Sequence, residues 1–507
     1  MADQAVVTSH PEATGAGLGI LEAGGTAVDA AVAAAAVLTV VDPRSTGIGG
    51  DLFAMVWEPG ADRPMGLNAA GGAPARMTFE ALKAQGFDAM PQVGPWSITV
   101  PGAAGGWHAL LSRFGSCSLS SILSPAISLA RDGASVTRVV AKEWAANVEK
   151  LRSNEAAAAQ FLPGGNPPAE GAVLKNEPYA ALLEQLMTDG LQSFYRPETA
   201  ALIADAVEQL GGPLRRNDLQ GWDRAEWVDT EAISFGDYAI HELPPPGQGL
   251  AAMVAVGVYT QRPPTDTSDA VHAAIESIKC GFLDAQRYVA DPRFETVPLA
   301  ELLEPSRLRT LRDEIDRQPP RRMHIGPPTD TVYLAVADRF GGACSLIQSV
   351  YDGFGSAVCV PELGIVLQNR AGCFDLVANH PNAPRPGKRP YHTIIPAMLS
   401  RQSEFAGCLG VVGGFMQPQG HLQVMRNLVE LGMDPQDAVD APRFRVMSGG
   451  RVEFEAGTSQ GLLEAMTNRG HSVGELDEFL AGGAQMLLRT DEGIVVGSDR
   501  RKDGYVG

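Results

Sequence analysis

The sequence predicts an α/β protein on three observations. Short segments of alternating apolar and β-branched residues are interspersed with longer segments whose apolar residues recur at helical spacing. A Gly- and Pro-rich linker at residues 323–328 precedes a last third that opens abruptly with a strand. The chain has 507 residues, of which 45% are hydrophobic, so it is long enough for two or three domains or one large intertwined core.

The first 60 residues predict a strand, two helices and a second strand. The apolar pattern places the first strand at 5–9 and the helices at 10–24 and 27–41. The second helix is Ala-rich and shorter than the ~20 apolar residues that cross a bilayer, so we expect it to be buried in the core. A glycine loop, STGIGGD at 45–51, leads into a strand at 52–57.

The rest of the chain continues this alternation. Further helices are expected at 142–161, 178–212, 268–289 and 422–432, and loops at 162–171 and 244–249 (PPPGQG). After the linker, the segments 331–337 and 343–350 predict a hairpin around the turn DRFGG, with further strands at 364–368 and 405–412. No internal repeat interrupts this pattern.

The composition excludes several classes of partner. The chain has 40 Lys and Arg against 59 Asp and Glu, for a net charge of −19. An acidic surface repels phosphate backbones and anionic lipids, so we expect neither a nucleic-acid nor a membrane partner. The N-terminus lacks the pattern of a secretory signal, and the six scattered cysteines suit a reducing compartment, so a cytoplasmic location is expected.

Short motifs give little support to cofactor or metal chemistry. The STGIGGD loop lacks GK[ST] and precedes a strand, so close backbone packing is favoured over phosphate binding. The nine histidines and six cysteines show no zinc-ligand spacing, and there is no GxSxG elbow. We therefore expect no cofactor and no metal.

One constellation remains, where the linker ends at Asp330 and Thr331 opens a strand. A cut between these residues would give Thr331 an α-amine with a pKa of about 7.7–8, close to the ideal for a general base. The pair Gly413–Gly414 follows a predicted strand and could aim N–H groups at an oxyanion. A strand-initial threonine is usually structural, so these residues alone leave the catalytic interpretation open.

Almost the whole chain resembles the γ-glutamyltransferase family of N-terminal-nucleophile hydrolases. The matching stretches occur in family order: LEAGGTAVDAAVAAAAVLTVVDPRSTGIGGD, VPGAAGGW, LSPAISLARDG, DLQGWDRAEW, PPPGQG, residues 330–369, GKRPYHTIIPA, VGGFMQPQGHLQ and DAVDAPRF. The resemblance implies an αββα sandwich made as one precursor that cleaves itself before Thr331. The products would be a large subunit, 1–330, and a small subunit, 331–507, which associate with each other.

The resemblance also implies roles for individual residues. Thr331 takes the place of the nucleophile, Ser349 the place of a hydroxyl that hydrogen-bonds it, and Gly413 and Gly414 match the oxyanion-hole pair. In self-cleavage the Thr331 hydroxyl would attack the carbonyl of Asp330, and water would resolve the resulting ester. A dimer of heterodimers is compatible with the resemblance.

The sequence departs from true γ-glutamyl enzymes where the substrate binds. A glycine-rich AAGGAP replaces the arginine that holds the donor's α-carboxylate. The family's serine pair is replaced by His392–Thr393, its acidic residue aligns with Cys373, and an asparagine is replaced by Tyr351. Losing one partner of such a charged pair costs ~2–5 kcal/mol of binding. The pattern resembles the acylase-like and small-amide branch, with cephalosporin (glutaryl) acylases and oxamate amidohydrolase.

Two residues are candidates to bind the substrate in place of the family's arginine and serine pair. Arg370 occupies a substrate-facing family position and could bind a carboxylate bidentately, with His392 donating beside it. A structural role for either residue is about equally plausible on sequence grounds. The leading hypothesis is an amidase for a small-molecule amide with an anionic acyl part and no α-amino group. A genuine γ-glutamyl hydrolase or transferase and an unprocessed binding protein are the alternatives.

Overall fold

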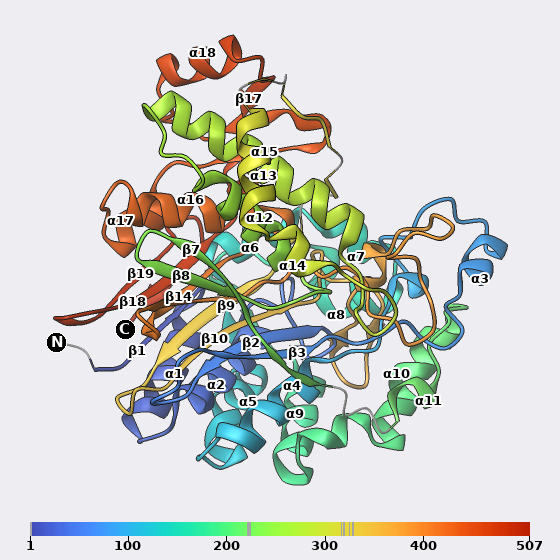
Figure 1. Ribbon diagram of the computed structural model, residues 1–507. Coiled ribbons are helices and arrows are strands. Elements are labelled where there is room, and N and C mark those ends of the chain that lie inside the picture. The colour runs from blue at the N-terminus through green and yellow to red at the C-terminus, as the bar shows by residue number, and fades with distance from the viewer. Residues whose placement is uncertain (1–2, 221–224, 316, 318–319, 324, 327–328) are drawn as a thin grey trace.

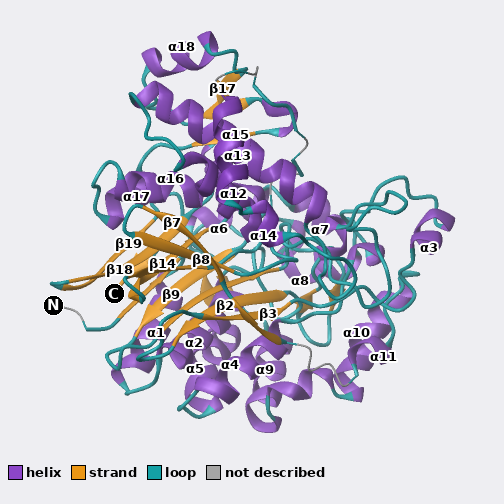
Figure 2. Cartoon of the chain, in the orientation of Figure 1, coloured by secondary structure: helices purple, strands orange, loops and turns teal. Residues whose placement is uncertain are grey.

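The computed structural model describes residues 3–507 except 221–224, 316, 318–319, 324 and 327–328. Two β-sheets stack face to face in the middle of the molecule, and helices cover the outer face of each (Figure 1). This four-layer αββα sandwich, seen by element type in Figure 2, confirms the fold class expected from the resemblance.

The first sheet has seven strands and joins both ends of the chain to its middle. Its order is β20 (Tyr505–Val506), β1 (Ala5–Thr8), β9 (Val332–Ala337), β10 (Ala343–Ser349), β2 (Asp51–Trp57), β3 (Met65–Ala69) and β6 (Glu226–Asp229). All neighbouring strands are antiparallel. The predicted hairpin is β9–β10, in which Leu334 pairs with Leu346.

The second sheet has six antiparallel strands and contains mostly C-terminal segments. Its order is β19 (Gly493–Ser498), β18 (Ala484–Thr490), β14 (Glu404–Val411), β13 (Ala397–Arg401), β8 (Tyr238–Glu242) and β7 (Glu231–Phe235). Because β8 and β7 come from the segment before the linker, both sheets are assembled across the Asp330–Thr331 peptide bond.

The alternation of side chains along β9 explains how the layers stack. Val332, Leu334 and Val336 face a core shared with the outer helices, whereas Tyr333 and Ala335 face the core between the sheets. The two sheets pack tightly here. A Cβ atom on Gly410 of β14 would lie 2.2 Å from the Tyr333 ring, so only glycine fits at that position.

The outer helices are amphipathic or fully buried. The first sheet is covered by α1 (Pro11–Glu22), α2 (Ala27–Val41), α4 (Ala103–Phe114), α5 (Leu119–Asp132) and α9 (Glu177–Asp189). The second is covered by α12 (Gly249–Tyr259), α13 (Thr267–Tyr288), α15 (Pro305–Ile315) and α16 (Gln417–Val429). The Ala-rich α2 is buried along almost its whole length, as expected, and begins with a capping box of Thr26 and Asp29.

Smaller elements complete the chain. The further helices are α3 (Phe79–Ala84), α6 (Arg138–Ala145), α7 (Val148–Arg152), α8 (Glu155–Phe161), α10 (Pro197–Gln209), α11 (Arg216–Leu219), α14 (Leu299–Leu302), α17 (Pro435–Asp440) and α18 (Gln460–Asn468). The short strands are β4 (Ala134–Ser135), β5 (Val173–Leu174), β11 (Cys359–Val360), β12 (Ile365–Val366), β15 (Phe444–Val446), β16 (Val452–Phe454) and β17 (Val473–Glu475).

The structure corrects several expected boundaries. The helix expected at 422–432 begins at Gln417. Pro418 is tolerated there because it lies in the first turn, where a backbone N–H would have no partner within the helix. The strand expected at 364–368 shrinks to the two residues of β12. The short strand β13 was not expected, since a proline precedes it and its pairing partners lie far away in the sequence.

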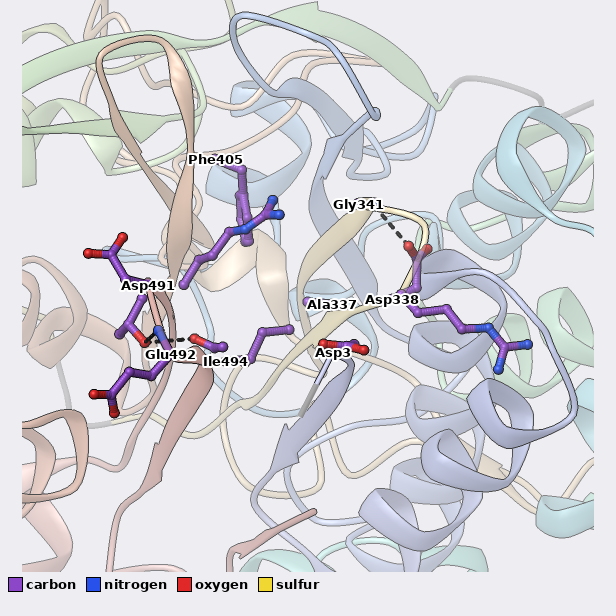
Figure 3. A pocket seen from close by; sticks show the side chains of 13 residues that line it. Asp3, Ala337, Asp338, Gly341, Phe405, Asp491, Glu492 and Ile494 are labelled. Carbon is purple, nitrogen blue, oxygen red and sulfur yellow. Dashed lines mark hydrogen bonds between the residues drawn. The ribbon is translucent and has the colours of Figure 1, made fainter. Parts of the chain in front are cut away.

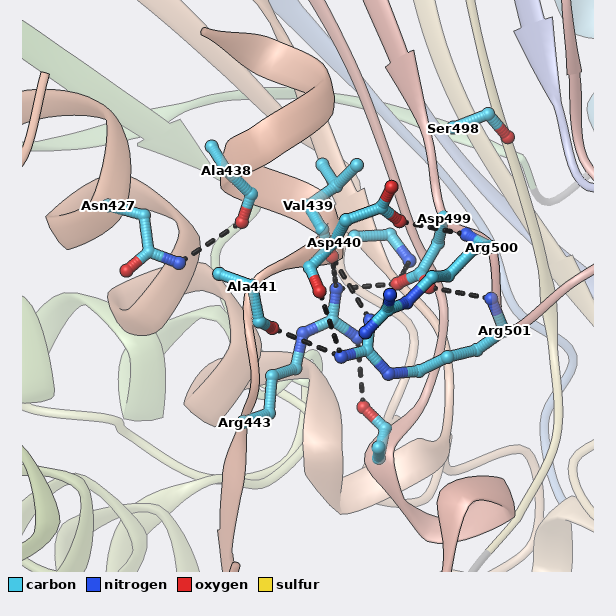
Figure 4. Close-up of polar contacts among 12 residues, drawn as sticks. Asn427, Ala438, Val439, Asp440, Ala441, Arg443, Ser498, Asp499, Arg500 and Arg501 are labelled. Carbon is cyan, nitrogen blue, oxygen red and sulfur yellow. Dashed lines mark hydrogen bonds and ion pairs between the residues drawn. The ribbon is translucent and has the colours of Figure 1, made fainter. Parts of the chain in front are cut away.

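A buried network of charges fixes the segment that follows β19 (Figure 4). Arg443 donates to the Asp499 carboxylate at 2.5 Å and to the Val439 carbonyl at 2.6 Å. Arg501 donates to Asp499 at 2.9 Å and to Glu455 at 2.7 Å. These contacts hold the backbone immediately before Lys502, which reaches the candidate site described next.

Candidate functional site

Thr331 and Ser349 meet because they lie at adjacent ends of the β9–β10 hairpin. Val332, the first residue of β9, pairs with Gln348, so Thr331 just before it lies beside Ser349 at the end of β10. Thr331 is 2% exposed and Ser349 is fully buried. The antiparallel register therefore brings the predicted nucleophile and its predicted hydroxyl partner together.

The hydroxyl of Thr331 lies against the peptide bond that precedes it. Its Oγ1 donates to the carbonyl oxygen of Asp330 at 2.5 Å and lies 3.4 Å from the Ser349 Oγ. The Ser349 hydroxyl donates to the same carbonyl oxygen at 2.9 Å and accepts a hydrogen bond from the Tyr351 N–H at 2.7 Å. Two hydroxyl groups, those of Thr331 and Ser349, thus converge on one carbonyl group.

Tyr351 supports this geometry with an unusual backbone conformation. Its φ angle is 82°, which a bulky residue rarely adopts and which costs of order 1–3 kcal/mol. The Tyr351 carbonyl accepts the N–H of Asp330 at 3.0 Å. The strained residue therefore contacts both Ser349 and the segment that carries the Asp330–Thr331 peptide bond.

Gly413 and Gly414 follow the end of β14, as expected. Both have positive φ, 108° and 61°, and the Gly414 carbonyl accepts a hydrogen bond from Gln248 at 2.9 Å. A Cβ atom on Gly414 would lie 1.8 Å from the Thr329 hydroxyl, and one on Gly326 would lie 2.4 Å from the Phe415 ring. The segment before Thr331 therefore packs against Gly414 and the neighbouring Phe415.

Arg370 is fully buried with much of its hydrogen-bonding capacity unused. Its guanidinium carbon lies 4.6 Å from the centre of the Tyr351 ring, and its Nη1 donates to the Thr393 hydroxyl at 2.9 Å. The Nε and Nη2 atoms have no hydrogen-bond partner among the described residues. Because a buried charge is costly unless it is paired, this guanidinium is suited to receive an anion.

His392 has partners on both ring nitrogens. Its Nε2 lies 2.9 Å from an Asp51 carboxylate oxygen and its Nδ1 lies 2.8 Å from the Pro390 carbonyl. Burial lowers the pKa of His392, while the hydrogen bond to Asp51 opposes that shift. Both ring nitrogens of His392 therefore have partners within the chain, and Thr393 is the residue that contacts Arg370 directly.

Cys373 lies at the end of the short turn Arg370–Cys373 and is half-buried. Burial raises the pKa of its thiol, and the neighbouring Arg370 opposes the shift. A thiol stands here in place of the carboxylate expected of a γ-glutamyl enzyme, so this position supplies no counter-charge for an ammonium group.

Sequence reasoning missed a buried group of charges around Asp330. Arg44 contacts the carboxylates of Glu143 and Asp330, and Lys502 lies 2.6 Å from Glu143 and 3.8 Å from Asp330. Burial alone would raise the pKa of Asp330, but Arg44 and then Lys502 hold it below its ordinary value. The one available signal was that Arg44 immediately precedes the STGIGGD loop.

The STGIGGD loop itself serves close packing, as expected. A Cβ atom on Gly49 would lie 2.2 Å from the Val366 carbonyl oxygen, and one on Gly50 would lie 2.3 Å from the Ser349 carbonyl oxygen. These glycines allow the loop to pass directly behind Ser349. Gln248 of the PPPGQG turn is a further residue that sequence reasoning missed, because it also donates to the Thr393 carbonyl at 2.5 Å.

A separate pocket of about 350 Å³ opens between the β9–β10 turn and the β18–β19 hairpin (Figure 3). Asp338, Phe405 and Asp491 are among its lining residues. It lies at the opposite end of the six-residue β9 from Thr331, about 20 Å away at ~3.3 Å per residue. This pocket is therefore not part of the candidate site.

Two searches of the described residues gave no result. Within that part of the chain, no group of three or more His, Cys, Asp or Glu side chains is arranged to hold a metal ion. None of the described helices combines the length and apolar character that a bilayer span needs.

The four-layer fold, with a threonine at the start of a central strand, defines the class of N-terminal-nucleophile hydrolases. The family model described as gamma-glutamyltranspeptidase matches residues 13–507. The chain belongs to this family.

Its relatives include several amide-bond hydrolases. The chain is 33% identical to the oxamate amidohydrolase proenzyme of Klebsiella pneumoniae, over 98% of this chain and 97% of the relative. It is 32% identical to the glutathione hydrolase-like YwrD proenzyme of Bacillus subtilis, over 99% and 97%. A cephalosporin acylase from Bacillus halodurans has a crystal structure similar to this chain, with a TM-score of 0.93, 40% identity and coverage of 99% and 95%. The chain is an amide-bond hydrolase of the gamma-glutamyltranspeptidase family.

Proposed function

We propose that the chain is a self-processing amidohydrolase whose nucleophile is Thr331. The observation that carries the proposal is the 2.5 Å contact between the Thr331 hydroxyl and the Asp330 carbonyl oxygen, with Ser349 donating to the same atom. A hydroxyl held against the preceding carbonyl is positioned to attack it. The word proenzyme in the names of the relatives is consistent with such a cleavage.

Self-cleavage would proceed through an ester. The Thr331 oxygen adds to the Asp330 carbonyl carbon, and the charge that develops on the carbonyl oxygen is stabilised by the Ser349 hydroxyl. The C–N bond breaks as the proton from the hydroxyl reaches the nitrogen, which leaves Asp330 esterified to Thr331. Water hydrolyses this ester to a carboxylate on Asp330 and a free hydroxyl and amine on Thr331. The large subunit 1–330 and small subunit 331–507 remain associated through the shared sheets.

The new α-amine would then serve as the base for amide hydrolysis. It takes the proton of the Thr331 hydroxyl as that oxygen attacks the substrate carbonyl, and it returns the proton to the departing amine. Once the segment before Thr331 has left Gly414, the backbone N–H groups of Gly413 and Gly414 can face the developing oxyanion. Water releases the acyl group from the threonine.

The substrate is an amide with an anionic acyl part and no α-amino group. Arg370 supports this assignment because two of its nitrogens have no partner among the described residues and Thr393 fixes its orientation. Cys373 supplies a thiol where an α-ammonium group would need a carboxylate. Glutaryl-like and oxamate-like acyl groups are the candidates that we propose, in line with the similarity to an oxamate amidohydrolase and a cephalosporin acylase.

Intact-mass measurement tests the first half of the proposal. Freshly purified protein should yield two chains that part between Asp330 and Thr331. The Thr331→Val variant, which replaces only the hydroxyl by a methyl group, should remain a single chain with no amidase activity. A wild-type chain that stays whole, or a Thr331→Val variant that still turns over amides, contradicts the proposal and favours the alternative of an unprocessed binding protein.

A substrate panel tests the second half. Glutaryl and oxamyl amides should be hydrolysed in preference to γ-glutamyl-p-nitroanilide. Arg370→Ala should lower kcat/KM for anionic acyl amides about 30-fold or more, as expected for the loss of one member of a buried charge pair. Arg370→Lys should lose less, and neutral acyl amides should be affected least. A uniform loss on all amides would assign Arg370 a structural role.

A γ-glutamyl hydrolase is the second candidate, and it has a specific basis in the similarity to the YwrD proenzyme. It predicts that γ-glutamyl-p-nitroanilide is the best substrate of the panel. We further propose a cytoplasmic location, which the six unpaired cysteines support, and a dimer of heterodimers. Cell fractionation and light scattering of the purified protein test these two statements.

A further inference from the structure

The charges around Asp330 form the most concentrated buried ionic cluster near the candidate nucleophile. Arg44, Glu143 and Lys502, which we call the Asp330 clamp, come from the loop before β2, from α6 and from the segment after β19. Their side chains are 5%, 9% and 12% exposed, and that of Asp330 is 13% exposed. Three distant parts of the chain thus converge on the residue that precedes the nucleophile.

Such a cluster calls for an explanation other than stability. Removing charges from water is costly, and a buried ion network is often no more stabilising than apolar residues of the same size. Stability alone therefore does not explain why the residues of the clamp are charged. The position of the clamp supplies a reason, because both carboxylate oxygens of Asp330 are engaged: Oδ2 by Arg44, and Oδ1 by Lys502 at 3.8 Å and by the Thr331 N–H at 2.7 Å.

The remaining polar groups of Asp330 are also held. Its N–H donates to the Tyr351 carbonyl at 3.0 Å, and its carbonyl oxygen accepts from Thr331 and Ser349. The side chain, the N–H and the carbonyl group are therefore all fixed relative to the Thr331 hydroxyl. Because the carboxylate accepts the N–H of the scissile amide itself, it fixes the rotation of that peptide plane.

We propose that Arg44 and Lys502 are positioning residues for self-cleavage, which act by holding the Asp330 carboxylate so that the peptide bond before Thr331 faces the attacking hydroxyl. This inference rests on the self-cleavage of the proposed function. The clamp takes no part in the bond changes: the Thr331 oxygen forms the ester, the C–N bond breaks, and the hydroxyl proton goes to the nitrogen. Glu143 orients Arg44 and Lys502 by contacting both.

The rate of self-cleavage in matched variants tests this role. Asp330→Asn keeps the size of the side chain and removes its charge, and Arg44→Gln removes the charge that binds it. Each should slow the first-order appearance of the two subunits on denaturing electrophoresis at least tenfold. Arg44→Lys should recover a substantial part of the rate, and Lys502→Met should slow it less than Arg44→Gln because Lys502 lies farther from Asp330.

Asp284→Asn is the matched control. Asp284 lies on α13 and is also a buried carboxylate, and one of its oxygens lies 2.8 Å from the Arg307 guanidinium. It should cleave within twofold of wild type. Unfolding temperatures are measured for every variant combined with Thr331→Val, so that all chains are compared uncut. A positioning role predicts that the cleavage rate of the Asp330 and Arg44 variants falls while their unfolding temperatures stay close to that of the control.

Three results would overturn the inference. The first is cleavage of Asp330→Asn and Arg44→Gln within twofold of wild type. The second is an equal slowing in the Asp284→Asn control, and the third is no difference between Arg44→Lys and Arg44→Gln. All of these leave the proposed function intact as long as wild type cleaves before Thr331, whereas a wild-type chain that stays whole overturns the proposed function itself.

Discussion

Replacing Ser349 by alanine should slow self-cleavage far more than it weakens the fold. The Asp330 carbonyl oxygen accepts hydrogen bonds from two described hydroxyls, those of Thr331 and Ser349. Once the Thr331 oxygen becomes the nucleophile it no longer donates, so Ser349 is left as the donor to the developing oxyanion. Loss of one oxyanion-hole donor typically costs about 10²–10³ in rate, or about 2.7–4 kcal/mol. We expect the upper part of this range.

The cost in stability is smaller and has a different origin. The Ser349 oxygen accepts the buried N–H of Tyr351 at 2.7 Å, and alanine leaves that donor unpaired. An unsatisfied buried donor costs about 1–3 kcal/mol. The variant should therefore unfold at a moderately lower temperature while remaining folded at 25 °C.

The assay is a time course of subunit appearance on denaturing electrophoresis, with Ser349→Thr as the control because threonine keeps the hydroxyl. Ser349→Thr should cleave within about tenfold of wild type, with the difference set by its extra methyl group in a fully buried site. If folded Ser349→Ala protein matures at the wild-type rate, the carbonyl contact has no role in the reaction and the reasoning fails.

Three further predictions follow from the packing and the titratable groups. Gly414→Ala places a Cβ atom 1.8 Å from the Thr329 hydroxyl in a backbone with φ of 61°, so self-cleavage should slow, and intact mass over time would show an accumulating precursor. Gly410→Ala places a Cβ atom 2.2 Å from the Tyr333 ring between the sheets and should destabilise the fold by about 1–3 kcal/mol or more, which thermal unfolding would detect. Burial lowers the pKa of His241 to about 4, so the unfolded chain binds the proton more tightly and stability is lost as the pH falls from about 6.5 towards 4. Relative to His241→Gln in the Thr331→Val background, the chain should lose about 2 kcal/mol between pH 7 and pH 5, and equal pH slopes for the two would contradict the assignment.

The sequence was informative about the fold where patterns are local. Along β9 the alternation of residues from Val332 to Ala337 assigns one face to each core, and it can be read without any partner strand. The pairing of β9 with β1 and of β13 with β8 depends on contacts between segments that lie far apart in the sequence, such as Ala5 with Ala337 and His241 with Met398, which no local pattern encodes. The four-layer arrangement was expected because of the family resemblance rather than because of periodicity.

The same division holds for the candidate site. Thr331, Ser349 and Gly414 lie where motif positions placed them. Arg44 and Lys502 could not be found in this way, since Asp330 lies far from both of them in the sequence and no local pattern connects them to it. Likewise, nothing near His392 in the sequence reveals that an Asp51 carboxylate oxygen lies 2.9 Å from its ring nitrogen.

Arg44 and Arg370 are both buried but differ in how their charges are paired, and this difference separates the two reactions that we propose. Arg44 is paired with carboxylates of its own chain, those of Glu143 and Asp330, so its charge is already compensated in the intact chain. Arg370 is equally buried but keeps two nitrogens without a partner among the described residues, at a cost that folding alone does not recover. A buried cation that the chain leaves unpaired makes physical sense if an external anion completes it. Our proposals therefore assign Arg44 to self-cleavage and Arg370 to substrate binding, so variants of the two arginines should affect different reactions.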